Sequence, residues 1–413
     1  MIYLVSRQSF LFSSSRYTVI SFSAALAILE PIKLVQCDTE TSGLDCHTKK
    51  LLTIQLGNRK SQIVFDWTTL TDSEKHQLKI YLEDLDRTLL GWNLMFDLGF
   101  LYKENIWPKK IWDGMLADQL IFLGYPRVLA VDVYDKLNLP FYAPVYDEKT
   151  GALKHYELSY SLKAAAKRWC NIDIDKTVRG DIITKGLTEE TVEYAGLDVK
   201  WLEDIKDEQD KEIAKQHLEK AVVFECAFAR ALAYTKFCGI HLSYEKWSEK
   251  MKNDLERLNK ARKALDTWTI NYIKTEHPEL SSKYIFVDRQ GDLWNGFNLE
   301  PQCTINWDSS TQVIPLFELI GVHVTTFDKA TKMKKKSVDK KVLKPQKNDF
   351  EIVALFLEFQ AASKVVSTYG DNWLKAINPV TGRVHLEFHS IGTDTSRVSS
   401  GGGVYKLNAQ LGA

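Results

Sequence analysis

The sequence predicts an α/β protein, with a mixed sheet flanked by helices followed by a mostly α-helical region. Two observations indicate this. Short apolar runs separated by turn residues are concentrated in residues 33–92, and long helical patterns dominate after residue 188. With 413 residues, the chain is long enough for two or three domains of roughly 100–200 residues each.

The order of elements in the first half supports a mixed sheet. Strand-length apolar runs occur at residues 33–37, 51–56, 61–65 and 88–92. The second and third are joined by Gly57-Asn58-Arg59-Lys60, a turn that favours an antiparallel hairpin. Thr71 and Glu74 form a capping box before one helix, and residues 93–104 form the next. Residues 140–158 are expected to form an inserted loop or hairpin.

The second half is expected to be mostly helical. Thr188 is a predicted N-cap, and Gly239 a predicted helix end. Further helices are expected over residues 213–237, 244–276 and 350–376. Residues 383–390 alternate as a strand would.

Composition excludes several classes of protein. Charged residues make up 26% of the chain and hydrophobic residues 45%, so wholesale disorder is excluded. Lys plus Arg and Asp plus Glu are equal at 54 each, which excludes a uniformly basic coat but not a local basic patch. The scattered cysteines, the lack of a signal-peptide pattern and the lack of a long apolar stretch predict reduced thiols, a cytoplasmic location and no membrane span.

Residues 329–347 are a candidate for such a local patch, because they contain nine lysines and one acidic residue. Two interpretations remain open. The segment is either a solvated loop or a contact to a phosphate backbone.

Two carboxylates end the first apolar run. Asp38 and Glu40 lie two residues apart, so in a strand both side chains project from the same face. Two adjacent carboxylates repel each other unless a cation lies between them. Oxygen ligands suit Mg²⁺ or Mn²⁺, so the pair is a candidate metal site.

Two further motifs place polar side chains one helical turn apart. Asn93 and Asp97 occur at i and i+4 after a strand, and Tyr194 and Asp198 have the same spacing in the helix after Thr188. An apolar stripe beside the second pair should pack on the sheet; it consists of Val192, Ala195, Val199 and Leu202. Each motif alone is weak evidence, but the three together predict one carboxylate site.

These residues resemble a known family. The strings DTE, GWNLMFD and YAGLD resemble the three motifs of DnaQ-like 3′–5′ exonucleases, which have an RNase H-like fold, in the subtype with Tyr in the third motif. Residues 222–242 and 363–400 resemble the thumb and the start of the palm in family A DNA polymerases. The match weakens at the end, where Asn408 and Gln410 fit and their neighbours do not. Ser396 stands where the family usually has Gly.

The resemblance implies a domain organisation. Residues 1–30 would be an N-terminal extension, residues 31–212 the exonuclease domain, and residues 213–413 the thumb and partial palm. No D-Y-S-x-I-E, R-x3-K-x6-Y-G or H-D-E string is present, so we expect no DNA synthesis from this chain alone. A split polymerase completed by a second chain, a fragment and a truncated product are all compatible with this.

The resemblance also implies residue roles. Asp38, Glu40 and Asp198 would bind one Mg²⁺ or Mn²⁺ ion, and Asp38 with Asp97 a second. Tyr194 and Glu40 would orient the attacking water. Four residues would contact DNA, either at its single-stranded 3′ end or as a primer-template duplex; they are Asn93, Phe96, Lys364 and Arg397.

The predicted activity is 3′–5′ proofreading hydrolysis of DNA during replication, in a bacterium or a phage-infected cell. A ribonuclease D-like exoribonuclease and a non-catalytic DNA-binding polymerase fragment are the alternatives. The aromatic cluster after the second motif is either core or a surface on which terminal bases stack; its members are Trp92, Phe96, Phe100 and Tyr102.

Overall fold

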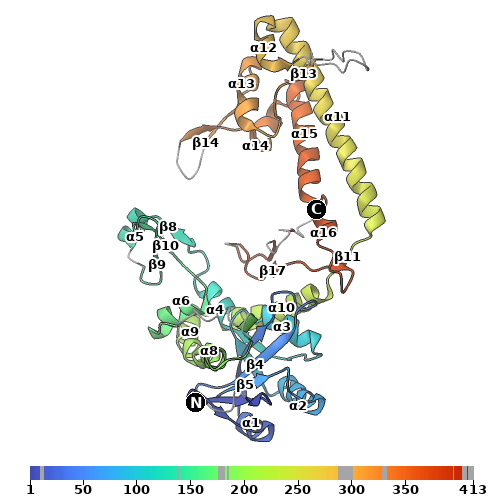
Figure 1. Cartoon of the computed structure of the whole chain (residues 1–413). Coiled ribbons are helices and arrows are strands. Elements are labelled where there is room, and N and C mark those ends of the chain that lie inside the picture. Colours follow the sequence, from blue (N-terminus) through green and yellow to red (C-terminus); the bar gives the residue numbers. More distant parts are fainter. Residues whose placement is uncertain are drawn as a thin grey trace. The chain divides into compact units, whose positions relative to one another are not determined.

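The computed structural model describes residues 1–9, 14–137, 139–174, 182–183, 186–286, 301–327, 333–393, 395–401 and 407. The chain divides into two compact units (Figure 1). Unit 1 comprises Met1–His241 and Asn378–Ala413, and unit 2 comprises Leu242–Ile377. Asn408, Gln410, Lys329 and Lys332 lie outside the described residues.

Unit 1 is built on a seven-stranded mixed sheet of order β2-β1-β5-β4-β3-β6-β7. Its strands are β1 (Ile2–Val5), β2 (Thr18–Val19), β3 (Leu34–Thr41), β4 (Leu51–Gly57), β5 (Gln62–Asp66), β6 (Thr88–Gly91) and β7 (Ile111–Asp113). β4 pairs antiparallel with both β3 and β5, which confirms the predicted hairpin, and β6 pairs parallel with β3.

The sequence predicts that residues 1–30 are an N-terminal extension. In the structure they contribute the strands β1 and β2 to this sheet. β1 pairs parallel with β5, from Ile2 opposite Gln62 to Val5 opposite Phe65. The run IYLV is strand-like but only four residues long. Only its pairing with β5 in the folded structure shows that this run is a strand of the sheet.

Side chains alternate between the two faces of the sheet. Leu4 and Val64 contact the helix α8 (Glu189–Lys200) through Val192 and Ala195. Their neighbours Val5 and Phe65 point to the other face, where they join the larger core cluster. That face is covered by α1 (Phe22–Leu29), α2 (Asp72–Glu83), α3 (Met95–Lys103), α4 (Gly114–Ile121) and α10 (Glu219–Cys238). The sheet therefore lies between two helical layers.

Unit 1 has further described elements beside the seven-stranded sheet and the helices named above. They are β8 (Val128–Leu129), α5 (Val131–Leu137), β9 (Ala143–Tyr146), β10 (Leu153–Glu157), α6 (Leu162–Cys170), α9 (Leu202–Gln216), β11 (Ile240–His241), β16 (Arg383–Val384), β17 (Phe388–His389) and β18 (Ser399–Ser400). The sequence predicts either a loop or a hairpin over residues 140–158. β9 and β10 pair antiparallel, so the structure shows the hairpin.

Three predicted elements are wrong in their extent. The helix expected over residues 350–376 is α15 (Glu351–Thr368) followed, after a break, by the short helix α16 (Asn372–Lys375). The helix expected over residues 213–237 is interrupted, because His217 adopts a left-handed conformation (φ 58°) that ends α9 before α10 begins. The strand expected over residues 383–390 is two short strands, which pair with β11 and β18 respectively. The predicted stop at Gly239 is confirmed (φ 64°).

Unit 2 is organised by two long helices that pack on each other, α11 (Tyr244–Glu276) and α15 (Glu351–Thr368). The helix predicted over 244–276 is confirmed to the residue. The other elements are η2 (Pro278–Leu280), α12 (Ser281–Tyr284), β12 (Ile285–Phe286), β13 (Gln302–Cys303), α13 (Ser310–Ile320), β14 (Thr325–Phe327), β15 (Lys334–Lys336), α14 (Lys340–Leu343), η3 (Lys344–Gln346) and α16 (Asn372–Lys375). Its core is apolar and includes Leu265, Ile273, Phe317 and Phe356.

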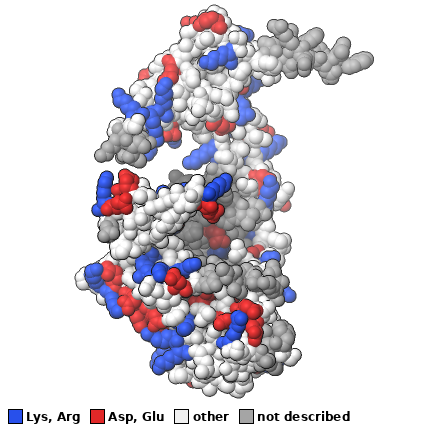
Figure 2. All heavy atoms as spheres, turned by 60° about the vertical axis from the view of Figure 1, so that its left-hand side comes forward, with Lys and Arg blue, Asp and Glu red and all other residues white. Residues whose placement is uncertain are grey.

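The described part of the lysine-rich segment is structured. β15 pairs antiparallel with β14, and its three lysines are exposed. On the face drawn in Figure 2, basic and acidic side chains are interspersed rather than segregated. All six cysteines are free thiols, and among the described helices none is long and apolar enough to cross a membrane.

Candidate metal centre

Strand β3 brings Asp38 and Glu40 to one face of the sheet, as their spacing predicts. Asp38 lies opposite Gln55 of β4, and Glu40 lies opposite Thr53. The intervening Thr39 points to the other face. Asp38 and Glu40 are half-buried. The carboxylates therefore lie near the end of a central strand, on the α8 side.

Helix α8 supplies the third carboxylate. The predicted N-cap is confirmed, because the Thr188 hydroxyl accepts a hydrogen bond from Thr191 N–H. The predicted stripe is buried on the sheet through Val192, Ala195, Val199 and Leu202. Gly196 permits this close approach, because a Cβ there would lie 2.8 Å from Ile2 Cγ2. The same packing places Tyr194 and Asp198 one turn apart, with 8% and 7% exposure.

The structure brings Asp38, Glu40 and Asp198 together. One carboxylate oxygen from each lies within 4.8 Å of the others. Three like charges at this separation repel one another, and a cation would remove that cost. The donor set consists of oxygens alone, which is the set preferred by hard divalent cations. The residues present therefore fit a divalent metal ion.

Asp97 approaches from the other side of β3. It lies in the first turn of α3, is 3% exposed, and accepts a hydrogen bond of 2.6 Å from the Thr39 hydroxyl. Burial, and second the neighbouring Asp38 carboxylate, raise the pKa of Asp97 well above its usual range. The Thr39 side chain points away from Asp38, Glu40 and Asp198, and its hydroxyl holds the Asp97 carboxylate in place. Sequence reasoning overlooked Thr39, although it separates Asp38 from Glu40.

The predicted pairing of Asn93 with Asp97 on one helix face is wrong. Asn93 has a left-handed backbone (φ 61°) and precedes α3, and its side chain is exposed. The turn is tight: a Cβ on Gly91 would lie 2.9 Å from the Cys37 carbonyl oxygen. Phe96 is partly buried and contacts Phe100 at 5.3 Å between ring centroids. Phe100 and Tyr102 are core residues, at 1% and 4% exposure.

Asp113 is a positioning residue that sequence reasoning missed. Its carboxylate accepts hydrogen bonds from the N–H groups of Asn93, Leu94 and Met115 at 2.7–3.0 Å. It thereby fixes the turn before α3 while capping α4. Burial raises the pKa of Asp113, although these backbone donors oppose the shift. The available signal was an Asp directly before the helix that starts at Gly114.

The two cationic candidates, Lys364 and Arg397, lie in different units. Lys364 is exposed on α15 of unit 2, and Arg397 is exposed in unit 1. The Arg397 N–H donates to the Thr393 hydroxyl, and its carbonyl accepts from Gly392 N–H, both at 3.0 Å. Arg397 therefore closes a loop beside a cavity of unit 1.

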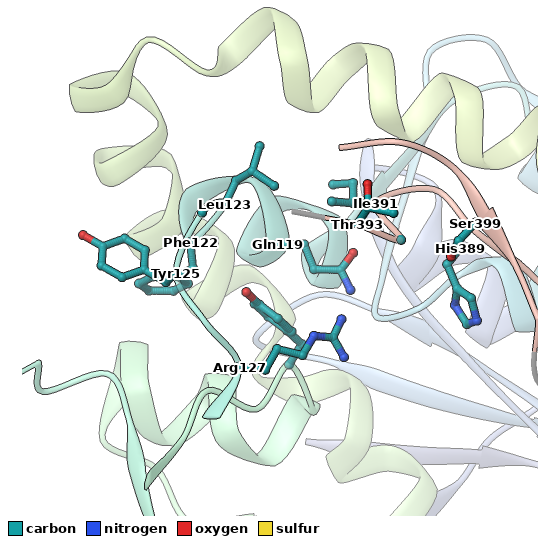
Figure 3. A pocket seen from close by; sticks show the side chains of 12 residues that line it. Gln119, Phe122, Leu123, Tyr125, Arg127, His389, Ile391, Thr393 and Ser399 are labelled. Carbon is teal, nitrogen blue, oxygen red and sulfur yellow. The ribbon is translucent and has the colours of Figure 1, made fainter. Parts of the chain in front are cut away.

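That cavity has a volume of about 250 Å³ and lies between the end of α4 and residues 389–399. Figure 3 shows Phe122 and Tyr125 at one end and His389 and Ser399 at the other, with Gln119 and Arg127 between them. No carboxylate is among the described lining residues. The Arg127 guanidinium lies 5.2 Å from the centre of the Tyr160 ring. Aromatic faces beside a cation suit a base and its phosphate.

A mixed sheet between helical layers, with carboxylates converging from β3 and α8, defines an RNase H-like fold of the DnaQ-like exonuclease type. Comparisons with known proteins agree. Residues 18–214 match the family model described as 3′-5′ exonuclease, and residues 297–402 match the model for DNA polymerase family A. The chain therefore contains a 3′–5′ exonuclease domain of the kind that family A DNA polymerases carry, followed by a segment that is similar to their polymerase domain. Members of this exonuclease family use divalent metal ions.

Curated relatives match most of this chain. DNA polymerase I of Borreliella burgdorferi is 25% identical over 93% of this chain and 36% of its own length. DNA polymerase I of Aquifex aeolicus is 25% identical over 91% and 54%. The chain thus spans about a third to a half of these relatives.

A solved structure shows the same fold. The polymerase domain of M. smegmatis Pol1, in complex with DNA primer-template and dNTP, superimposes with a TM-score of 0.62. It is 14% identical, and the match covers 92% of this chain and 53% of that chain.

Proposed function

We propose that this chain removes the 3′-terminal nucleotide of single-stranded DNA by hydrolysis of the last phosphodiester, with two Mg²⁺ or Mn²⁺ ions. The observation that carries the proposal is the convergence of three carboxylates from β3 and α8, with Asp97 buried behind them. Within a polymerase that acts in DNA replication, this hydrolysis would be the proofreading step.

The positions of the side chains support the roles that we propose for them. Asp38, Glu40 and Asp198 would hold one ion, and Asp38 with Asp97 the other. When bound, the ions would supply an activated water nucleophile and charge stabilisation for the leaving oxygen. Glu40 would accept a hydrogen bond from the attacking water and the Tyr194 hydroxyl would donate one to it, and these contacts would orient the water. Thr39 and Asp113 keep Asp97 and its turn in place.

The DNA strand needs its own contacts. We propose that Phe96 and Asn93 support the terminal nucleotides. Arg397 and the cavity that contains Arg127 would contact the strand farther from its end. Lys364 on α15 would contact duplex DNA. The exposed cationic side chains of Arg127, Lys364 and Arg397 would attract the phosphates of DNA. The protein as a whole has no net charge and would not attract them.

The test compares matched 5′-labelled DNA and RNA oligonucleotides of one sequence, with Mg²⁺, Mn²⁺ or EDTA. We expect DNA to shorten from its 3′ end, one nucleotide at a time, and only with metal. Faster loss of RNA would assign the ribonuclease D-like activity instead. Binding of DNA without hydrolysis under any metal would assign the non-catalytic alternative.

We further propose that a second polypeptide carrying the palm and fingers completes a polymerase with this chain. The match of residues 297–402 to the DNA polymerase family A model supports a polymerase partner, which would carry the three polymerase strings of that family. Affinity purification from the native host tests this. A partner whose sequence contains those strings is the expected result, and its absence would contradict the proposal.

A further inference from the structure

The loop of residues 42–50 joins β3 to β4 and begins two residues after Glu40. Asp45 organises this loop, because its carboxylate accepts hydrogen bonds from the His47 N–H at 3.0 Å and from the Thr48 hydroxyl at 2.8 Å. Burial alone would raise the pKa of Asp45, but these hydrogen bonds, with one from outside the loop, lower it. The carboxylate of Asp45 is therefore ionised at neutral pH.

The hydrogen bond from outside the loop comes from Asn378. Its amide nitrogen donates to the Asp45 carboxylate at 2.9 Å, across 333 residues of sequence. Its amide oxygen accepts the N–H groups of Val380 and Thr381 at 2.9 and 3.3 Å, which forms a turn in its own segment. One end of the Asn378 amide therefore shapes that turn, and the other end holds the loop.

A pair of histidine rings makes a second contact between the loop and the same segment. The centre of the His47 ring lies 4.0 Å from that of His385 and 4.9 Å from that of Phe237. The His385 ring is fixed in turn, because Nδ1 donates to the Lys236 carbonyl oxygen at 2.8 Å and Nε2 accepts from the Thr381 hydroxyl at 2.7 Å. The loop therefore packs on a ring whose orientation is set by both of its nitrogens.

The loop is also attached to the helix that carries Asp97. Lys103 of α3 donates to the carbonyl oxygens of His47 and Lys49, at 3.3 and 2.7 Å. The loop lies within the stretch that matches the exonuclease family model, and residues 378–385 lie within the stretch that matches the polymerase family model. A polymerase-like segment therefore holds a loop that adjoins the carboxylate cluster of the exonuclease domain.

We propose that Asn378 is a positioning residue of the exonuclease site, which acts through Asp45 and sets the affinity of the site for DNA. This inference rests on the proposed function. The loop exposes Lys49 and Lys50 beside the end of β3, and exposed lysines attract phosphates. The carboxylates of the cluster are placed by β3 and α8 instead. Loss of the contact should therefore weaken DNA binding and leave metal binding unchanged.

Asn378→Asp tests the contact. A carboxylate keeps an oxygen for the N–H groups of the turn, but it replaces the donor with a charge of the same sign as that of Asp45. Asp45→Asn combined with Asn378→Asp reverses the direction of the hydrogen bond and should restore it. Asn105→Asp is the matched control in the same unit, because the Asn105 amide oxygen accepts from the Trp107 indole N–H at 2.8 Å and a carboxylate would keep that bond.

Three measurements are made on the full chain. Trypsin cleavage after Lys49, followed by mass spectrometry, reports on the position of the loop without metal or DNA. Hydrolysis of single-stranded DNA with Mg²⁺ separates KM from kcat, and calorimetric titration with Mn²⁺ measures metal affinity. We expect Asn378→Asp to raise the cleavage rate and KM about tenfold, with kcat and Mn²⁺ affinity within about twofold of the parent chain. The double variant and Asn105→Asp should stay within about threefold of the parent chain in every measurement.

The remaining outcomes contradict the inference. Unchanged cleavage and KM in Asn378→Asp would show that the contact positions nothing. Faster cleavage with an unchanged KM would show that the loop has no part in DNA binding, and a raised KM without faster cleavage would place the effect outside the loop. A double variant as impaired as Asn378→Asp would exclude the hydrogen bond as the cause. A parent chain that hydrolyses no DNA with any metal would overturn the proposed function as well, whereas unchanged variants of an active parent overturn this inference alone.

Discussion

The two units bury different kinds of side chain. Among the described residues, every charged side chain that is buried lies in unit 1; these are Asp66, Asp97, Asp113, Asp118, Asp198 and Glu225. In unit 2 the buried polar groups are Thr269 and Ser337, and the core is otherwise apolar. A buried carboxylate costs free energy unless it is paired. Unit 1 therefore contains groups that stability alone would not select.

The buried acids of unit 1 are satisfied in two different ways. Asp118 is paired with Arg168 at 2.8 Å and accepts hydrogen bonds from Trp169 and Gln209. That network links α4, α6 and α9, so it is structural. Asp97 instead faces Asp38, a charge of the same sign. A bound cation would compensate the repulsion between these two carboxylates, whereas the Asp118 network needs no cation.

The largest effect is expected where the carboxylates converge. Asp38→Ala or Asp198→Ala should lower exonuclease activity about 10³-fold or more, since each removes a ligand the reaction needs. Folding should be retained, because the change relieves repulsion. Asp72→Ala is the control. It alters the other D-x-E string, which belongs to the capping box of α2. Turnover that survives in Asp38→Ala, measured on a labelled oligonucleotide, would remove the cluster from the mechanism.

The second effect should separate the units. Phe356→Ala removes a ring that is 1% exposed in the core of unit 2, and should destabilise that unit by about 3–5 kcal/mol. Hydrolysis of single-stranded DNA by unit 1 should change less than twofold. Phe65→Ala, in the core of unit 1, should lower both. Urea denaturation followed together with activity makes the comparison, and equal loss of activity in both variants would show that the units depend on each other.

The sequence predicts the carboxylate cluster better than it predicts the residues that hold the cluster and its neighbours in place. Strand alternation gave Asp38 and Glu40, and helical spacing with an apolar stripe gave Tyr194 and Asp198, because these are local periodicities. The predicted pairing of Asn93 with Asp97 on one helix face is wrong because Asn93 has a left-handed backbone before α3, and a helical spacing rule cannot detect such a residue. Asp113 and Thr39 act across distances of 20 and 58 residues along the chain. Contacts of that kind depend on tertiary packing.

The fold shows the same division. The long helix α11 has the predicted bounds to the residue, whereas the sequence predicts neither β1 nor the break at His217. Four residues of strand, or a single change of backbone conformation, carry little local information. They are fixed by the partner strand in one case and by the packing of two helices in the other.

A smaller effect concerns the cost of keeping Asp97 ionised. Its pKa is raised in the fold, so the stability it contributes is present below its unfolded pKa and is lost as pH rises through the folded pKa. Asp97→Asn removes that loss. In EDTA, the variant should melt higher than the parent chain at pH 8, and the difference should shrink towards pH 4.5. The same variant should lose exonuclease activity, and a pH-independent difference in melting temperature would contradict the argument.

The smallest expected effect distinguishes the two interpretations of the lysine-rich segment. Lys334 and Lys336 lie on β15, and Lys336 is already paired with Glu318 of α13 at 2.7 Å. If the strand contacts duplex DNA, Lys334→Ala should reduce the slope of log affinity against log salt by about 0.9, the value for one phosphate. Lys336→Ala should reduce it less, since part of its charge is neutralised within unit 2. Fluorescence anisotropy with a primer-template duplex between 50 and 200 mM salt measures both slopes. Unchanged slopes in both variants would assign the segment to solvent and restrict DNA binding to other surfaces.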